Sequence, residues 1–117
     1  MTLTRRSLLA GAAALTLLPG TAFAAATAET EAILSLLPDR KTAARIGETW
    51  VQREHPRPDA VLESLQRRLS GGDAGKLRDA IADDFRNGAV VKIEGWQIAR
   101  TQAELCALAY FSTTGSL

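Results

Sequence analysis

Few side chains in this sequence could carry out covalent or metal chemistry, and each of them stands alone. The single histidine, His55, precedes Pro56, and the single cysteine, Cys106, lies within an apolar run. A metal site needs several converging ligands, and a nucleophilic thiol needs a base and an open, electropositive setting. We therefore interpret His55 as a solvated or capping residue and Cys106 as a small buried hydrophobe. A catalytic Cys106–His55 pair is the alternative interpretation.

Two pairs of adjacent like charges, Asp83-Asp84 and Arg67-Arg68, are further candidates for a site. Neighbours on an α-helix point about 100° apart, so the two carboxylates of the first pair cannot face each other. Asp79 lies four residues before Asp83, and this spacing predicts a solvated acidic stripe. We expect the arginine pair to be solvated as well.

A glycine-rich run, residues 71–76, ends in Lys76 but lacks both the G-x-x-x-x-G-K-S/T spacing and a preceding strand. We interpret it as a turn rather than as a phosphate-binding loop. No flavin, nucleotide, haem or iron–sulfur motif is present, so we predict that the protein has no cofactor of its own.

The elements that position these residues are mainly helical, because apolar residues recur at three- and four-residue spacing in five segments. The predicted helices are 27–37, a second that starts at Asp39, a third over 59–69, a fourth between Asp73 and Asn87-Gly88, and a fifth that starts at Thr101. Prolines separate the first three. In the second helix, Gly47 is expected to admit a close neighbour beside Trp50. In the fifth, Thr101 and Glu104 match the S/T-x-x-E capping box.

Between the last two helices the sequence predicts a β-hairpin over about 90–93 and 96–99, joined by Glu94-Gly95. A two-residue turn places Ile93 opposite Trp96 on an apolar face. We therefore expect a mainly α domain of about five helices and one hairpin, with Trp96 as its central core residue. The larger set of candidate core or interface residues is Trp50, Phe85, Trp96 and Cys106.

The N-terminus has the features of an export signal. Arg5 and Arg6 precede an apolar run from Leu8 to Leu18, which is too short to span a bilayer of about 30 Å. Adjacent arginines before such a run favour the twin-arginine route, and the general secretory route or a short membrane anchor are the alternatives. Ala22 and Ala24 fit a cleavage site, so we predict a signal peptide over 1–24 and one mature domain over 25–117.

The charge balance of the mature chain limits the classes of partner. Without Arg5 and Arg6, 12 basic residues stand against 13 acidic ones, and no basic cluster appears in the sequence. This balance argues against binding to nucleic acid or to an anionic membrane surface. A lone cysteine cannot form an intramolecular disulfide, so stability must come from the core.

The C-terminal half carries a recognisable signature, whose parts are Asp84-Phe85-x-x-Gly88, Val91-x-Ile93-x-Gly95-Trp96 and Ala99-Arg100-Thr101-x-Ala103-Glu104-Leu105-Cys106-Ala107-Leu108-Ala109. It resembles the signature of a family of small, mostly uncharacterised bacterial proteins that carry twin-arginine signals. In size and signal alone, the chain is similar to the small subunits of periplasmic flavin-dependent sugar and alcohol dehydrogenases. Neither resemblance implies a catalytic residue.

Three functions are compatible with these observations. Twin-arginine export carries folded chains, often with a cofactor or with a partner that holds one. The first hypothesis is therefore a periplasmic escort or small subunit for a larger exported oxidoreductase. The second is a free-standing periplasmic binding or stress module. An enzyme is the third, and it would need carboxylates, arginines and Cys106 or His55 in one cleft. The other expected partners are the twin-arginine translocase and signal peptidase.

Overall fold

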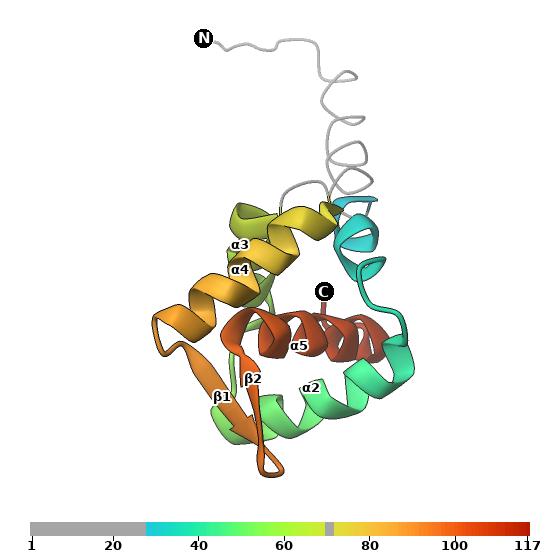
Figure 1. The fold of residues 1–117 in the computed structure, drawn as a ribbon. Helices are drawn as coiled ribbons and strands as arrows, with labels where there is room; N and C mark the ends of the chain where they lie inside the picture. Colours follow the sequence, from blue (N-terminus) through green and yellow to red (C-terminus); the bar gives the residue numbers. More distant parts are fainter. Residues whose placement is uncertain (1–27, 70–71) are drawn as a thin grey trace, which may run out of the picture.

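The computed structural model describes residues 28–69 and 72–117. They are mainly helical, with one antiparallel hairpin between the last two helices, as predicted (Figure 1). Helical residues 28–34 are followed by α2 (Arg40–Glu54), α3 (Pro58–Leu69), α4 (Ala74–Arg86), β1 (Val90–Ile93), β2 (Trp96–Ala99) and α5 (Arg100–Thr114).

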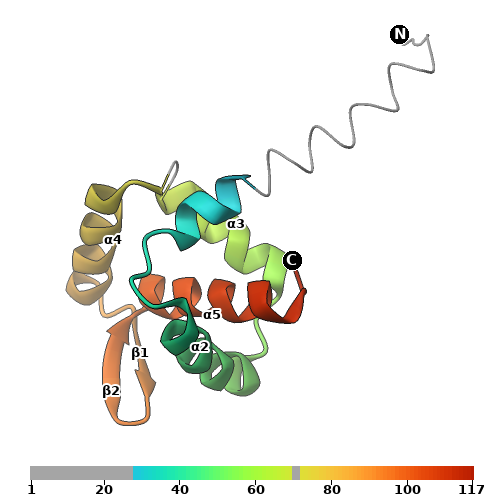
Figure 2. The same cartoon turned by 90° about the vertical axis from the view of Figure 1, so that its right-hand side faces the viewer.

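Helix α5 is the central element of the fold. In two perpendicular views it lies among α2, α3 and α4, with the hairpin beside its first turn (Figures 1 and 2). Its residues from Ala103 to Ala109 are all buried, so α5 is covered all round. The sequence predicted only an apolar stripe on this helix. Glu104 is charged and the alanines are small, so neither indicated that the other faces of the helix would be buried as well.

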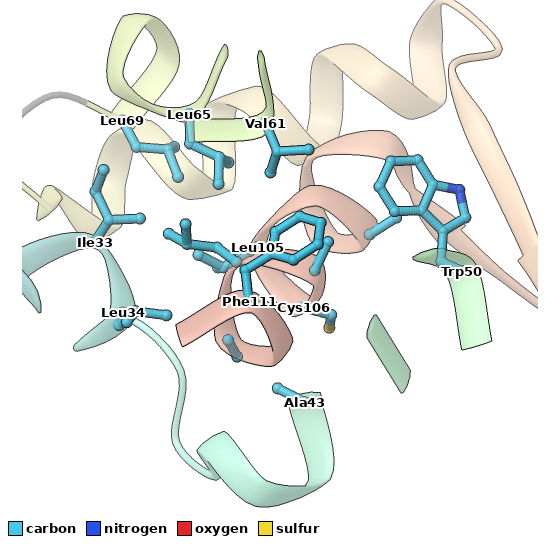
Figure 3. Packing of buried hydrophobic residues seen from close by; sticks show 14 of the residues in the cluster. Ile33, Leu34, Ala43, Trp50, Val61, Leu65, Leu69, Leu105, Cys106 and Phe111 are labelled. Carbon is cyan, nitrogen blue, oxygen red and sulfur yellow. The ribbon is translucent and has the colours of Figure 1, made fainter. Parts of the chain in front are cut away.

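The core is built from large side chains that the surrounding elements direct at α5. Figure 3 shows Ile33, Leu65 and Leu69 gathered around Leu105 and Phe111. Ile33, Leu65 and Leu69 have no exposed surface. Their burial supplies the main stabilisation, at about 25 cal/mol for each Å² of apolar surface removed from water.

Helices α2 and α5 meet at Gly47, whose missing side chain allows the close approach that the sequence predicted. A Cβ built on Gly47 would lie 2.1 Å from the carbonyl oxygen of Cys106. Any larger residue would therefore collide with the backbone of α5 rather than with a movable side chain.

Local signals set the ends of the outer helices. The carboxylate of Asp39 accepts hydrogen bonds from the first amides of α2, and Asp73 does the same for α4. Gly88 follows the end of α4 with φ of 74°, a conformation that glycine adopts without a steric cost.

The hairpin has the predicted register, with Ile93 opposite Trp96 and Val91 opposite Ile98. Its turn residues Glu94 and Gly95 both have positive φ, at 50° and 85°, as a type I′ turn requires. The turn therefore makes Ile93 and Trp96 the last cross-strand pair before the end of the hairpin.

Candidate functional site

The two candidate nucleophilic or acid–base residues do not form a site. Cys106 is buried on α5, where burial raises the pKa of its thiol to about 11. His55 is exposed and ends α2 in the left-handed conformation, and its backbone N–H donates to the carbonyl of Val51 at 2.8 Å. Within the described residues, no hydrogen bond joins the two side chains, and the catalytic pair has no structural support.

This burial predicts an unreactive thiol. At about pH 8, a pKa near 11 leaves only about one thiol in a thousand ionised, and a bulky reagent cannot reach it. We expect a disulfide reagent such as dithionitrobenzoate to leave Cys106 unmodified in the native protein and to modify it rapidly in guanidinium chloride. Stoichiometric release of the coloured thiolate from the native protein would contradict this.

A partly buried charge network joins α3, α4 and the start of α5, and it corrects the interpretation of Asp84 and Arg68 as solvated. Asp84 is only 7% exposed. Its carboxylate accepts from Arg68 Nη1 at 3.4 Å and from the backbone N–H of Thr101 at 2.7 Å. Arg68 also donates to the Thr101 hydroxyl. Asp83, in contrast, is exposed and pairs with Arg86 in the last turn of α4.

The same contacts show that the predicted Thr101–Glu104 capping box is wrong. Helix α5 begins at Arg100, and the side chain of Gln102 accepts from the N–H of Ala99 at 2.9 Å. Asp84 caps the helix from a different element, with a negative charge at the positive end of the helix dipole. Glu104 is thus free for other partners.

Glu104 lies 5% exposed at the side of α5, next to a surface groove. Its Oε1 accepts from the Ser64 hydroxyl at 2.9 Å and lies 3.6 Å from Arg68 Nη2. Its Oε2 lies 3.6 Å from Arg100 Nε, and the guanidinium of Arg100 stands 5.6 Å above the ring of Trp50. Neither His55 nor Cys106 lines this groove, so the combination required for the enzyme hypothesis does not form there.

The four candidate core or interface residues divide into two buried and two exposed ones. Trp50 is 3% exposed and Cys106 8%, so both belong to the core. Trp96 is 76% exposed and Phe85 49%, so the expectation that Trp96 is the central core residue is wrong. Phe85 likewise does not share the buried side of α4. Both are apolar side chains presented to solvent.

Trp96 is exposed because of where it stands on the hairpin. It is the first residue of β2, directly after the turn, whereas its cross-strand partner Ile93 is 5% exposed. Ile93 and the neighbouring Ile46 on α2 line a depression of about 380 Å³ between the hairpin and α2. Trp96 is therefore the exposed member of a cross-strand pair whose other member, Ile93, lines this depression.

Arg5, Arg6, Ala22 and Ala24, the residues of the predicted export and cleavage signals, lie outside the described residues. In the part of the chain that the structure describes, no three histidine, cysteine or acidic side chains gather into a group that could hold a metal ion. Within residues 28–69 and 72–117, no helix combines the length and apolar character needed to cross a bilayer. Comparisons with protein-family models, curated proteins and solved structures give no match.

Proposed function

We propose that the protein is exported to the periplasm by the twin-arginine route and acts there as an accessory protein for a larger, cofactor-bearing oxidoreductase. The N-terminal motif around Arg5 and Arg6 and the absence of a cofactor motif in the sequence support this proposal. The observation that carries it is Trp96, which the type I′ turn presents to solvent with 76% of its surface exposed.

An exposed tryptophan directly after a hairpin turn is well suited to bind another protein. Tryptophan is enriched among the residues that dominate binding energies, because it buries a large area at little conformational cost. Burying about 150 Å² of Trp96 would contribute on the order of 3 to 4 kcal/mol. Association costs at least about 4 kcal/mol in lost freedom, so one side chain does not suffice.

The neighbouring depression enlarges the interface that Trp96 can form. Ile46 lines it and is 36% exposed, and the polar part of its lining consists of Thr42, Arg45, Glu48, Thr49 and Glu94. We name Trp96 together with this depression the hairpin-tip surface. A protruding indole beside a hollow fits a partner that has both a pocket and an inserting side chain.

The test is recovery of the tagged protein from its own periplasm, with identification of the proteins bound to it. We expect the wild-type protein to bring a larger cofactor-bearing oxidoreductase, and Trp96→Ala to lose that partner. Because Trp96 is exposed, its replacement should change the free energy of unfolding by less than about 1 kcal/mol. Gln97→Ala is the matched control, since Gln97 is exposed on the other face of the same strand.

Two results would reject the proposal. One is a wild-type protein that is recovered alone. The other is a partner that binds Trp96→Ala as well as it binds the wild type, because the hairpin-tip surface would then have no part in the association.

A further inference from the structure

A second surface, separate from the hairpin-tip surface, has the composition of a ligand site. It is a groove of about 540 Å³ between α3 and the start of α5, with Trp50 of α2 in its wall. Four arginines, Arg57, Arg67, Arg68 and Arg100, line it together with a single carboxylate, Glu104. We name it the arginine groove.

The concentration of arginines in this groove is unusual for a chain of this charge. The described residues carry nearly equal numbers of basic and acidic side chains, yet four of their nine arginines line the arginine groove. An adjoining depression shares Trp50 and Arg100 with it and adds Arg53, Lys92 and one carboxylate, Glu54, which pairs with Arg53. Positive side chains therefore outnumber carboxylates in the lining of both hollows.

Three of these arginines keep hydrogen-bond donors for a ligand. The distances of Arg68 and Arg100 to Glu104 are both 3.6 Å, which holds the charges together but is too long for a direct hydrogen bond. The terminal nitrogens of Arg100 have no acceptor within the described part of the chain, and Arg67 has no ion pair there.

Arg57 offers fewer free hydrogen-bond donors to a ligand than these three arginines. It is paired with Asp59, and the hydrogen bonds from Arg57 hold the pKa of the Asp59 carboxyl below its usual value. The available donors therefore lie on Arg67, Arg68 and Arg100, which project from two different helices into one hollow.

Two of these three arginines, Arg68 and Arg100, are held in place by neighbouring side chains. Arg100 lies over the ring of Trp50 at 5.6 Å, and Arg68 is fixed by Asp84 and Thr101. A pre-positioned guanidinium loses less entropy when a ligand binds, and its planar fork matches the two oxygens of a carboxylate or phosphate.

Apart from Ser64, the remaining lining is apolar, with Val61 and Ala89 among its residues. The volume lies within the range of about 300 to 1,000 Å³ found for small-molecule sites. We propose that the arginine groove binds a small organic anion, with its carboxylate or phosphate on Arg67, Arg68 and Arg100 and a compact apolar body against the wall beside Trp50. This proposal does not depend on the partner protein proposed above.

The test uses two anionic probes, benzoate and phenyl phosphate, and a neutral one, benzyl alcohol, at constant ionic strength. In protein carrying Trp96→Phe, Trp50 is the remaining tryptophan, and its indole N–H resonance reports on the groove. We expect that resonance to shift saturably with at least one anion below about 10 mM and not with benzyl alcohol. Saturation by benzoate alone assigns the site to carboxylates, and saturation by phenyl phosphate alone assigns it to phosphate monoesters.

Variants show whether the arginines bind the anion. Arg67→Gln combined with Arg100→Gln should weaken binding, measured by calorimetry, at least about tenfold. Arg86→Gln is the control, because Arg86 is an exposed, ion-paired arginine on α4 outside the groove. The proposal is overturned if neither anion saturates, if benzyl alcohol binds as well as the anions, or if the double variant binds like Arg86→Gln.

Discussion

Replacing Asp84 with alanine is expected to lower the free energy of unfolding by about 3 kcal/mol. The substitution removes one partner of a buried ion pair, a change that costs about 3 to 5 kcal/mol where both groups are shielded. It also leaves the Thr101 amide at the start of α5 without its acceptor at 2.7 Å. We expect a loss at the lower end of this range because the side chain of Arg68 is 32% exposed, so water can replace part of the lost interaction.

Asp83→Ala is the matched control for this prediction, since it removes the same chemical group one residue earlier on α4. Asp83 is exposed and, within the described residues, its ion pair is with Arg86 in the last turn, so its removal should cost less than about 0.5 kcal/mol. Asp84→Asn keeps an acceptor for the Thr101 amide but removes the charge. Its loss of unfolding free energy should lie between those of Asp84→Ala and Asp83→Ala.

The measurement is urea unfolding followed by circular dichroism, with the slopes compared to verify that the denatured states are equivalent. For a domain whose total stability is about 5 to 15 kcal/mol, a loss of 3 kcal/mol is readily detected. If Asp84→Ala and Asp83→Ala prove equally stable, Asp84 does not hold α4 to the start of α5.

The contrast between Asp83 and Asp84 also shows what the sequence could not predict. Helical geometry placed the two carboxylates on different sides of α4, which is correct. It could not show that one side faces Arg68, which lies 16 residues earlier, and the amide of Thr101, which lies 17 residues later. The capping box of Thr101 and Glu104 was a sound local prediction, but long-range partners outside the helix replaced it.

Features that depend on neighbouring residues were predicted well. The hairpin and its register follow from a two-residue turn and the alternation of side chains along each strand, and both are confirmed. The exposure of Trp96 could not be predicted in the same way. Strand geometry places it on the face of Ile93, but only the packing of α2 against that face determines that Ile93 is covered and Trp96 is not.

The arginine groove illustrates the same limit. Arg67 and Arg68 are adjacent in the sequence, yet Trp50 and Arg100 join them from segments before and after. In the sequence the charges look evenly mixed, and the cluster arises only when α2, α3 and α5 pack together.

The second large effect is expected at the contact of α2 with α5, where Gly47→Ala should destabilise the protein by about 3 kcal/mol. Its new Cβ would lie 2.1 Å from the carbonyl oxygen of Cys106 and 2.7 Å from the nitrogen of Ala107, both in the backbone of α5. To reach normal contact, the two helices must move apart by about 1 Å, which opens the packing around Ala43 and Trp50. Alanine favours the helix over glycine by about 1 kcal/mol, which is too little to offset this cost.

Gly75→Ala provides the control, because it makes the same change in α4 where the nearest atom, at 3.1 Å, is an oxygen of the Asp73 side chain, which has to move by only a few tenths of an ångström and can continue to cap the helix. We expect its stability to remain within about 1 kcal/mol of the wild type. Cys106 offers an independent local measurement, since its thiol lies on the helix that Gly47 contacts. In Gly47→Ala the native thiol should react faster with dithionitrobenzoate, and in Gly75→Ala it should stay protected. Equal stability and equal protection in the two variants would show that α2 and α5 are not as closely packed at Gly47 as the structure places them.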